Sequence, residues 1–380
     1  KLLNIYKKMY VNYLESLENT GNEDFDGLMQ KAVDAIDSGT TIFETKKEKG
    51  DLTKLRYICI DEFQDFSLLF MRLIAAIREK NKNIEFFCVG DDWQAINGFA
   101  GSDLTYYENF SDYFKPSMKL NITGNYRSHE SIVNISNKIM NDLEGEPAIA
   151  KNSKEGRTSL IELDKFKPTI VEKQKYKVNF LTPALLRIIG RIIENEKFSV
   201  VLLNRFVNVN LQSKENRSLE KYLKYLRSFF PKNRWGQITI SNTHKYKGLE
   251  KNFVIVIDAD SSCYPFVHPD WIFNRVFGDT VDILEPAEKR LFYVAVTRAI
   301  NRLFIVTTSS DEITPFLDNI SIDKINWSDF PSIKTHQYNL TIQIQGKKGE
   351  GSSQTFNIKE PLKTNNYNFQ KKLMFIYQDK

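Results

Sequence analysis

The sequence has few cysteines and no long apolar run. Among its 380 residues the only cysteines are Cys59, Cys88 and Cys263, and none forms a Cys-x-x-Cys pair. This spacing argues against a disulfide framework and against a zinc knuckle. No apolar run reaches the length of a membrane span, and the first residues lack a signal-peptide pattern. We therefore expect a reducing, cytoplasmic setting with no membrane partner, in which Cys59 and Cys88 are small core residues.

The sequence also lacks a large excess of charge of one sign. Its 53 Lys and Arg residues are nearly balanced by 48 Asp and Glu residues, which gives a formal net charge of +5. This mildly basic balance is compatible with a nucleic-acid partner but is weak evidence for one. A hydrophobic content of 41% with 13% aromatic residues is sufficient for a sizeable core and excludes global disorder. The length allows two or three domains.

What the chain does contain is an alternation of strands and helices. Apolar runs predict strands at 57–60, 84–89, 118–122, 199–203, 237–240, 253–257 and 303–307. Helical spacing predicts helices at 2–36 with a break near residue 21, 67–79, 129–143, 183–194, 219–230 and 287–299. We interpret 46–54 as a loop and 144–156 as a polar linker. Such alternation indicates an α/β fold with parallel sheets flanked by helices.

Two carboxylates, Asp61 and Glu62, follow the first predicted strand. Ligands of open α/β sheets bind at the carboxyl ends of the strands. Successive side chains of an extended segment point in opposite directions, so one carboxylate can hold a hydrated metal while the other faces a reacting water. This pairing suits phosphoryl chemistry with Mg²⁺. For Asp-Glu alone, a strand with a polar turn after it is the commoner explanation.

Five motifs in a fixed order decide between these two interpretations. They are DEFQD at 61–65, GDDWQAI at 90–96, NYRS at 125–128, THKYKGLE at 243–250 and YVAVTRA at 293–299. Together they resemble motifs II to VI of the UvrD/Rep-like superfamily 1 DNA helicases, and the second is most similar to the helicase IV branch. The resemblance covers about residues 1 to 310, and a chance recurrence of all five in order is very improbable.

The resemblance implies two RecA-like lobes of the P-loop NTPase type, with ATP between them and single-stranded DNA across the top. We expect the carboxyl-terminal part of the first lobe, with motifs II and III, at 1–118, so the first lobe is incomplete. The second lobe, with motifs IV to VI, is expected at 119–330. The segment 331–380 is interpreted as an accessory hairpin or a tail that binds a protein partner.

The resemblance also implies roles for individual residues at the ATP site. Asp61 would hold Mg²⁺ and Glu62 would activate the hydrolytic water. Gln94 would sense the γ-phosphate, Tyr126 would stack on adenine, and Arg127 would contact the γ-phosphate. A surface amide and a core tyrosine are the ordinary alternatives for Gln94 and Tyr126.

The last two motifs are expected to supply the second lobe's residues at the ATP site. Gly248 and Glu250 are expected to bind the nucleotide, with Glu250 accepting from the ribose hydroxyls. Arg298 is the arginine-finger candidate, on a helix whose Leu291 and Val294 can pack inward. Its ordinary alternative is a helix C-terminal arginine that interacts with the helix dipole.

For DNA, the resemblance implies base stacking by Phe99 and phosphate contacts by Thr243 and His244. Asn97 stands where many relatives have an aromatic residue, and Ala100 where many have arginine, which weakens the expected grip on DNA. The 116 positions from Arg127 to Thr243 leave little room for the extra domain of the large family members.

No G-x-x-x-x-G-K-[ST] loop occurs; the single Gly-Lys pair, Gly346-Lys347, is followed by Lys348. We therefore expect a carboxyl-terminal portion of a longer bacterial, nucleoid-associated helicase, which as an isolated chain hydrolyses almost no ATP.

The resemblance implies an ATP-dependent 3′-to-5′ DNA helicase acting on single strands and junctions, with a role in DNA repair. Two alternatives stay open. One is a catalytically dead DNA-binding or regulatory module, and the other, ranked last, is a metal nuclease that uses Asp61, Glu62 and Asp91.

Overall fold

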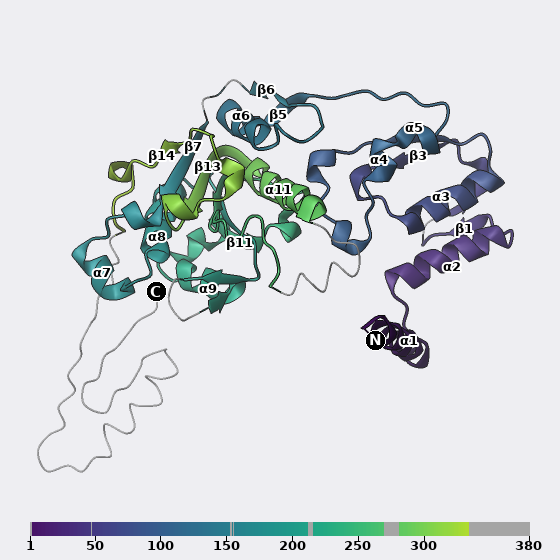
Figure 1. Ribbon diagram of the computed structural model, residues 1–380, viewed down its shortest axis with the longest axis horizontal. Coiled ribbons are helices and arrows are strands. Elements are labelled where there is room, and N and C mark those ends of the chain that lie inside the picture. The colour runs from purple at the N-terminus through teal and green to yellow at the C-terminus, as the bar shows by residue number, and fades with distance from the viewer. Residues whose placement is uncertain are drawn as a thin grey trace, which may run out of the picture.

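The computed structural model describes residues 2–46, 48–152, 154, 156–211, 216–269 and 281–333. Figure 1 shows two groups of elements, one built around a small sheet and the other around a large one. The expected α/β fold with parallel sheets flanked by helices is confirmed. The expected tail at 331–380 lies almost wholly outside the described residues, as do residues 270–280.

The first group is built around the parallel pair β3 (Tyr57–Ile60) and β4 (Glu85–Cys88). Its helices are α1 (Leu2–Thr20), α2 (Phe25–Asp37), α3 (Leu68–Lys80), α4 (Thr105–Glu108) and α5 (Phe110–Tyr113). Ser67 caps α3 by accepting from the backbone N–H of Phe70. Within the predicted loop at 46–54, β2 (Lys49–Asp51) is instead a short strand that pairs antiparallel with β1 (Ile42–Glu44), and a 3-10 turn, Leu52–Lys54, follows it.

One face of the β3–β4 pair is covered and the other is not. Ile58 and Phe86 pack under α2 and α3, whereas Tyr57 and Phe87 are each 64% exposed. The prediction that Cys59 is a core residue is therefore wrong, since Cys59 is exposed, and Cys88 is only partly buried. The apolar run predicted a strand correctly, but burial on both faces requires a second layer that these elements do not supply.

The second group contains a six-stranded, all-parallel sheet in the order β11-β8-β12-β13-β7-β14. These strands are β7 (Arg157–Glu162), β8 (Val200–Asn204), β11 (Ile238–Asn242), β12 (Lys251–Val256), β13 (Ala299–Thr307) and β14 (Asp323–Lys324). Small pairs lie beside it: β5 (Gly124–His129) with β6 (Ile149–Asn152), and β9 (Asn208–Asn210) with β10 (Asn216–Ser218).

Helices cover both faces of this sheet. Val201, Val254 and Leu303 point to one face, under α6 (Glu130–Ile139) and α11 (Val281–Thr297). The alternate positions Leu202 and Phe304 point to the other, under α8 (Leu181–Ile193) and α9 (Leu219–Arg227). A short helix, α7 (Ile170–Tyr176), precedes α8. Burial on both faces explains why these strands are continuous apolar runs.

The strand predicted at 118–122 is wrong. Residues 117–123 form no regular element, and Met118, Leu120 and Ile122 are between 77% and 89% exposed. The strand instead begins at Gly124 and includes the NYRS motif, because β5 pairs with β6 inside the segment predicted as a linker. Apolar alternation at 118–122 had no neighbouring strand to pair with.

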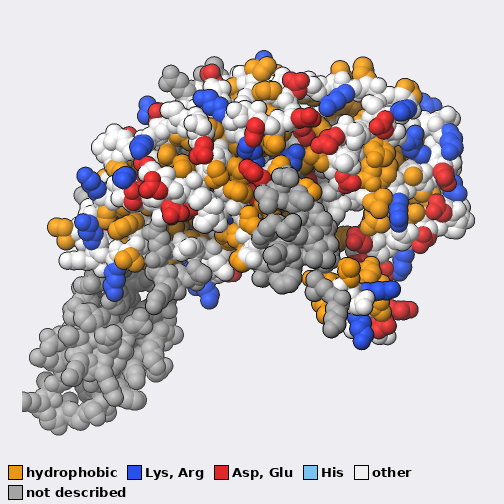
Figure 2. Space-filling view, viewed as in Figure 1, with side chains coloured by type: hydrophobic (Ala, Val, Ile, Leu, Met, Phe, Trp, Pro, Cys, Tyr) orange, Lys and Arg blue, Asp and Glu red, His pale blue; other side chains and the backbone are white. Residues whose placement is uncertain are grey.

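In the ranges given above, no helix combines the length and the apolar character that a bilayer crossing requires. Figure 2 shows acidic and basic side chains interspersed over the visible face, in agreement with the small net charge.

Candidate ATP and DNA site

Asp61 and Glu62 lie at the carboxyl end of β3, as the motif predicted, and both are exposed. Glu62 has a φ of 52°, in the left-handed region that is uncommon for residues other than glycine. Its backbone N–H donates to Asp61 Oδ1 over 2.9 Å. The turn thus directs the two carboxylates differently immediately after the strand.

A buried glutamine, Gln64, joins the first motif to the second. Its Nε2 donates to Glu62 Oε2 over 2.5 Å, and its Oε1 accepts from the backbone N–H of Asp91 over 3.0 Å. Gly90 allows this approach, because a Cβ at that position would lie 2.7 Å from Gln64 Oε1. We did not predict a role for Gln64; the only sequence signal was its place inside the motif.

The second motif then connects to Arg298, which follows α11 in the second group. Gln94 Nε2 donates to Asp91 Oδ2 over 2.7 Å, and Gln94 Oε1 accepts from Arg298 Nη2 over 3.1 Å. Together with Gln64, these contacts form a continuous chain of hydrogen bonds from Glu62 to Arg298. Gln94 is therefore engaged on both of its amide atoms and is not a free surface amide.

Arg298 is 2% exposed, although it carries a charge. Burial lowers the pKa of its guanidinium and the neighbouring Arg127 lowers it further, whereas Asp91 and Glu62 act in the opposite direction. Its Nε donates to the carbonyl of Val294 over 2.9 Å, so the ordinary helix-terminal role is also present. Its Nη1 donates to the carbonyl of Leu249 over 3.5 Å, and its Nη2 donates to the hydroxyl of Thr297 over 3.0 Å as well as to Gln94.

Lys247 also crosses between the two groups, and we did not predict it. Its Nζ lies 2.6 Å from Asp65 Oδ2 and 3.7 Å from Glu62 Oε2, and its side chain is only 11% exposed. Asn97 Nδ2 donates to the same Asp65 oxygen over 2.9 Å. A cation in this position partly balances the negative charges of Asp65 and Glu62.

The residues expected around the nucleotide's base and sugar lie within β5 and just before β12. Arg127 Nε forms an ion pair with Glu250 Oε2, although both side chains are almost half exposed. Tyr126 is 78% exposed, which excludes the core alternative. Gly248 has a φ of +78°, a conformation that glycine adopts without strain.

The three residues expected at DNA differ in their exposure. Phe99 is 80% exposed, and its ring meets that of His244 edge-on at 5.7 Å. They line a hollow of ≈ 550 Å³ together with Arg205 and Arg290. Thr243 is fully buried and its hydroxyl bonds to that of Tyr264, so its side chain is not presented to a ligand.

Burial, together with the positive charge of Arg205, lowers the pKa of His244 to about 4. A histidine with this pKa is neutral at pH 7. Because the folded pKa lies below the unfolded value of 6.5, its contribution to stability is complete above pH 6.5 and is lost as the pH falls towards 4. We expect His244→Gln to flatten this acid limb when the free energy of unfolding is measured by urea titration between pH 4 and 7. An unchanged limb would contradict the burial of the neutral ring.

Trp93 lies in the first group by sequence but packs into the core of the second. It is 4% exposed, its ring meets Tyr293 edge-on at 5.4 Å, and its Nε1 donates to the carbonyl of Glu144 over 2.7 Å. Gly145, with a φ of +136°, leaves the space that the indole occupies. This side chain therefore holds Gln94, its neighbour, against α11.

Trp93→Ala should lower the free energy of unfolding by about 3–5 kcal/mol, because it opens a large cavity and leaves the Glu144 carbonyl without its donor. Denaturant titration measures this loss. The control is Phe87→Ala at an exposed position, whose free energy of unfolding should lie within about 0.5 kcal/mol of that of the unchanged protein. Equal losses in the two variants would show that the indole does not anchor the first group of elements to the second.

The carboxylates after β3 suit a hydrated Mg²⁺ that also binds phosphate better than a metal ion held by protein side chains alone. Among the residues that the structure describes, no group of three or more His, Cys, Asp or Glu side chains could hold a metal ion alone. Mg²⁺ commonly keeps several waters and takes one or two protein carboxylates together with substrate phosphates. The exposed Asp61 carboxylate suits that mode.

Family models match most of the region that carries these motifs. The UvrD/REP helicase N-terminal domain matches residues 2–115, and the UvrD-like helicase C-terminal domain matches residues 185–310. The first match includes the motifs at 61–65 and 90–96, the second includes those at 243–250 and 293–299, and the motif at 125–128 lies between the two matches.

Individual relatives agree with the family models. DNA helicase IV of Escherichia coli K12 is 26% identical to this chain over 78% of this chain. A probable DNA helicase of Mycoplasma pneumoniae is 27% identical over 70% of this chain. This chain spans 38% and 46% of those two proteins, less than half of either. A solved C-terminal domain of a possible DNA helicase from Lactobacillus plantarum WCFS1 aligns over 52% of this chain and 94% of that domain, at 14% identity and a TM-score of 0.31.

Proposed function

Because the chain belongs to the UvrD/Rep family of superfamily 1 helicases, we propose that it forms most of the motor core of an ATP-dependent 3′-to-5′ DNA helicase. The motor would couple ATP hydrolysis to movement along single-stranded DNA and to unwinding at junctions. In this proposal the two groups of elements are the two lobes between which ATP binds.

The observation that carries the proposal is the chain of hydrogen bonds from Glu62 through Gln64, Asp91 and Gln94 to Arg298. It connects a candidate general base in one lobe to a candidate arginine finger in the other. Such a connection is what a motor requires if the closure of the lobes is to assemble the hydrolytic site. A metal nuclease has no use for Arg298 or for Tyr126.

Each residue has a defined role in this scheme. Glu62 orients and deprotonates the attacking water, and Arg298 with Arg127 stabilises negative charge that develops on the γ-phosphate. Asp61 would hold Mg²⁺, which when bound neutralises phosphate charge. Tyr126 offers an exposed ring for adenine, and Glu250 with Gly248 forms the wall next to the ribose.

The hollow beside Phe99 supports a DNA-binding role. An exposed aromatic ring next to Arg290 combines a stacking surface with positive charge, which suits single strands of any sequence, whereas Arg205 in the same hollow is paired with Glu288. His244, neutral at pH 7, would support the ring through their edge contact. We assign Thr243 to the folding of this loop and not to a direct DNA contact.

Phe99→Ala should weaken binding of a fluorescein-labelled oligothymidylate by about tenfold, since stacking on one aromatic residue contributes about 1–3 kcal/mol. Fluorescence anisotropy with the 380-residue chain measures the change at a fixed salt concentration. The matched control is Phe25→Ala, which removes an exposed phenylalanine from α2.

An equal, small effect of both substitutions would refute the stacking role of Phe99. Strong DNA binding without DNA-stimulated ATP turnover, in a protein that also carries a Walker A loop, would favour the non-catalytic DNA-binding module instead.

A further inference from the structure

A basic surface on α9 and the neighbouring α7 lies outside all five motifs. Residues 163–180 and 216–234, which contain these two helices, hold 11 Lys and Arg residues but 3 Asp and Glu residues. This excess of eight exceeds the +5 of the whole chain, so the remaining residues are net acidic. Both helices lie on the α8 face of the large sheet, where Tyr176 and Tyr222 pack (Figure 1).

Cations and aromatic rings alternate across this surface. The Arg217 guanidinium lies 4.6 Å from the centre of the Tyr225 ring, which meets the ring of Phe229 edge-on at 5.2 Å. Lys175 Nζ of α7 lies 4.5 Å from the centre of the same Phe229 ring. Lys221 shares the side of α9 that carries Tyr225, because it lies four residues earlier in the helix. These contacts join β10, α9 and α7 into one surface.

The lysines of this surface have no counter-ion within the chain. Among the residues that the structure describes, Lys175, Lys221 and Lys224 form no ion pair. Burial lowers the pKa of Lys175, and no carboxylate acts in the opposite direction. The three ammonium groups are therefore available to an external anion.

The three acids of these two segments do not balance the lysines. Asp164 pairs with Lys165, and Glu172 pairs with Arg187. Glu220 lies in the first turn of α9, where a carboxylate interacts favourably with the helix dipole.

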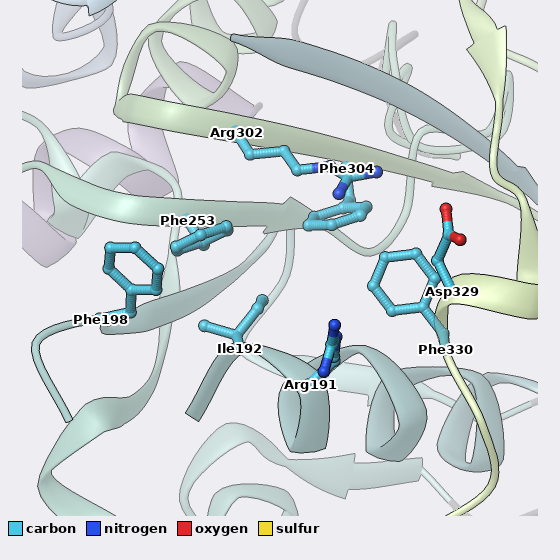
Figure 3. Close-up of a pocket in the computed structure, with 8 residues that line it drawn as sticks. All are labelled: Arg191, Ile192, Phe198, Phe253, Arg302, Phe304, Asp329 and Phe330. Carbon is cyan, nitrogen blue, oxygen red and sulfur yellow. The ribbon is translucent and has the colours of Figure 1, made fainter. Parts of the chain in front are cut away.

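A neighbouring cavity shows the opposite situation. Figure 3 shows this cavity, of ≈ 290 Å³, with Arg191 and Arg302 on different sides of it. Arg191 bonds to Glu194, and the negative charge of Asp329 acts on Arg302. The cations of the cavity are thus compensated within the chain, whereas the lysines of the α7–α9 surface are not.

We propose that the α7–α9 surface binds the phosphate backbone of double-stranded DNA, beside a single strand held in the hollow next to Phe99. This assignment rests on the DNA-dependent function proposed above. The β9–β10 hairpin connects the two places, because β9 begins three residues after Arg205 of the hollow and β10 contains Arg217. Double-stranded DNA carries one negative charge for about every 1.7 Å of its axis, so one short stretch can contact several lysines.

Two other partners suit this surface less well. A single strand needs free rings for base stacking, whereas Lys175 lies over Phe229 and Arg217 lies over Tyr225. A membrane-surface helix needs an apolar side that faces lipid, but the apolar side of α9 is buried in the core through residues such as Tyr222. No side chain of α9 belongs to the exposed large hydrophobic residues.

The test uses the 380-residue chain and a fluorescein-labelled DNA duplex, with fluorescence anisotropy as the readout. We expect a dissociation constant of about 1–100 μM at physiological salt, the range of sequence-independent binding. Lys221→Gln combined with Lys224→Gln should weaken binding at least about tenfold at about 50 mM salt. It should also reduce the slope of log K against log salt by about two, since each lost phosphate contact removes about 0.9.

The matched control is Lys7→Gln combined with Lys8→Gln, which removes the same charge from exposed positions of α1 and should leave the slope unchanged. Equal slopes in the two double variants would overturn the proposal. If circular dichroism shows that the α9 variant does not fold, Lys175→Gln replaces it under the same criterion.

An oligothymidylate separates this proposal from the motor function. Its binding should be nearly unchanged in the α9 variant, because the hollow next to Phe99 is intact. If the unchanged chain binds the oligothymidylate but not the duplex, the assignment of the surface fails while the motor proposal stands. Binding of neither probe would contradict both proposals.

Two further probes represent the rival partners. Because Ile170 and Val171 of α7 are exposed, vesicles of phosphatidylserine and phosphatidylcholine are tested by cosedimentation, and polyglutamate is tested as a competitor of the duplex. We expect no cosedimentation, and weaker competition by polyglutamate than by unlabelled duplex at equal charge concentration. Vesicle binding without duplex binding, or competition by polyglutamate equal to that of the duplex, would overturn the proposal.

Discussion

Arg298→Ala should lower DNA-stimulated ATP turnover by about a thousandfold or more, in a protein that carries these motifs together with a Walker A loop. Arginine fingers contribute about 10³–10⁵ to the turnover of nucleotide hydrolases, because the guanidinium neutralises charge that exists only in the transition state. In this chain Arg298 already points across the lobes at Gln94 Oε1, 3.1 Å away. Steady-state kinetics at saturating ATP measure the loss.

Stability has to be separated from catalysis here, because Arg298 also bonds to the Val294 carbonyl. Arg298→Lys keeps the positive charge but cannot make both contacts, so it should fold while losing most of the turnover. Arg72→Ala, an exposed arginine of α3, serves as the control and should leave the rate unchanged. A turnover within tenfold of the unchanged protein for a folded Arg298→Lys would remove the arginine-finger role.

Glu62→Gln should abolish hydrolysis, by about 10²–10⁴-fold, while nucleotide binding persists. The amide cannot accept a proton from water, but its oxygen can still accept from Gln64 Nε2, so the hydrogen-bond chain to Arg298 stays intact. A single-turnover measurement with radiolabelled ATP, together with equilibrium binding of a fluorescent nucleotide, separates the two effects.

The control for this substitution is Glu79→Gln on the exposed side of α3, which should alter neither quantity. Retained turnover in Glu62→Gln would exclude Glu62 as the base. Loss of nucleotide binding as well would indicate that the carboxylate positions phosphates or Lys247 and does not act on water.

The large sheet could be predicted from the sequence because its strands are buried on both faces. The runs at 199–203 and 253–257 are apolar at every position except Ser199 and correspond to β8 and β12 within one or two residues. Local pattern carries less information where a strand is covered on one side only or lacks a neighbour. Cys59 and the segment 118–122 were assigned wrongly for that reason, since pairing and coverage are properties of the whole fold.

The candidate site was predictable to the extent that its residues belong to motifs. The structure brings Glu62, Gln94 and Arg298 together as the motifs implied, and it exposes Tyr126 and Phe99. The contributions of Gln64, Lys247 and Trp93 were missed, because each depends on a contact with a residue far away in the chain. Lys247 meets Asp65 across 182 positions, a pairing that no local pattern encodes. In the same way, the burial of Thr243 could not be predicted from its place in a motif.

The burial of Trp93 under α11 has a consequence for exchanging parts between relatives. A chimaera joined near residue 118, the expected boundary between the lobes, would separate this indole from Tyr293 and from the Glu144 carbonyl. The chain after the short helix Asp92–Gln94 returns to the first group, where Tyr106 and Phe114 pack against Phe63. In any graft this short helix should therefore come from the same parent as Tyr293 and Glu144, even though the residues on both sides of it belong with the first group.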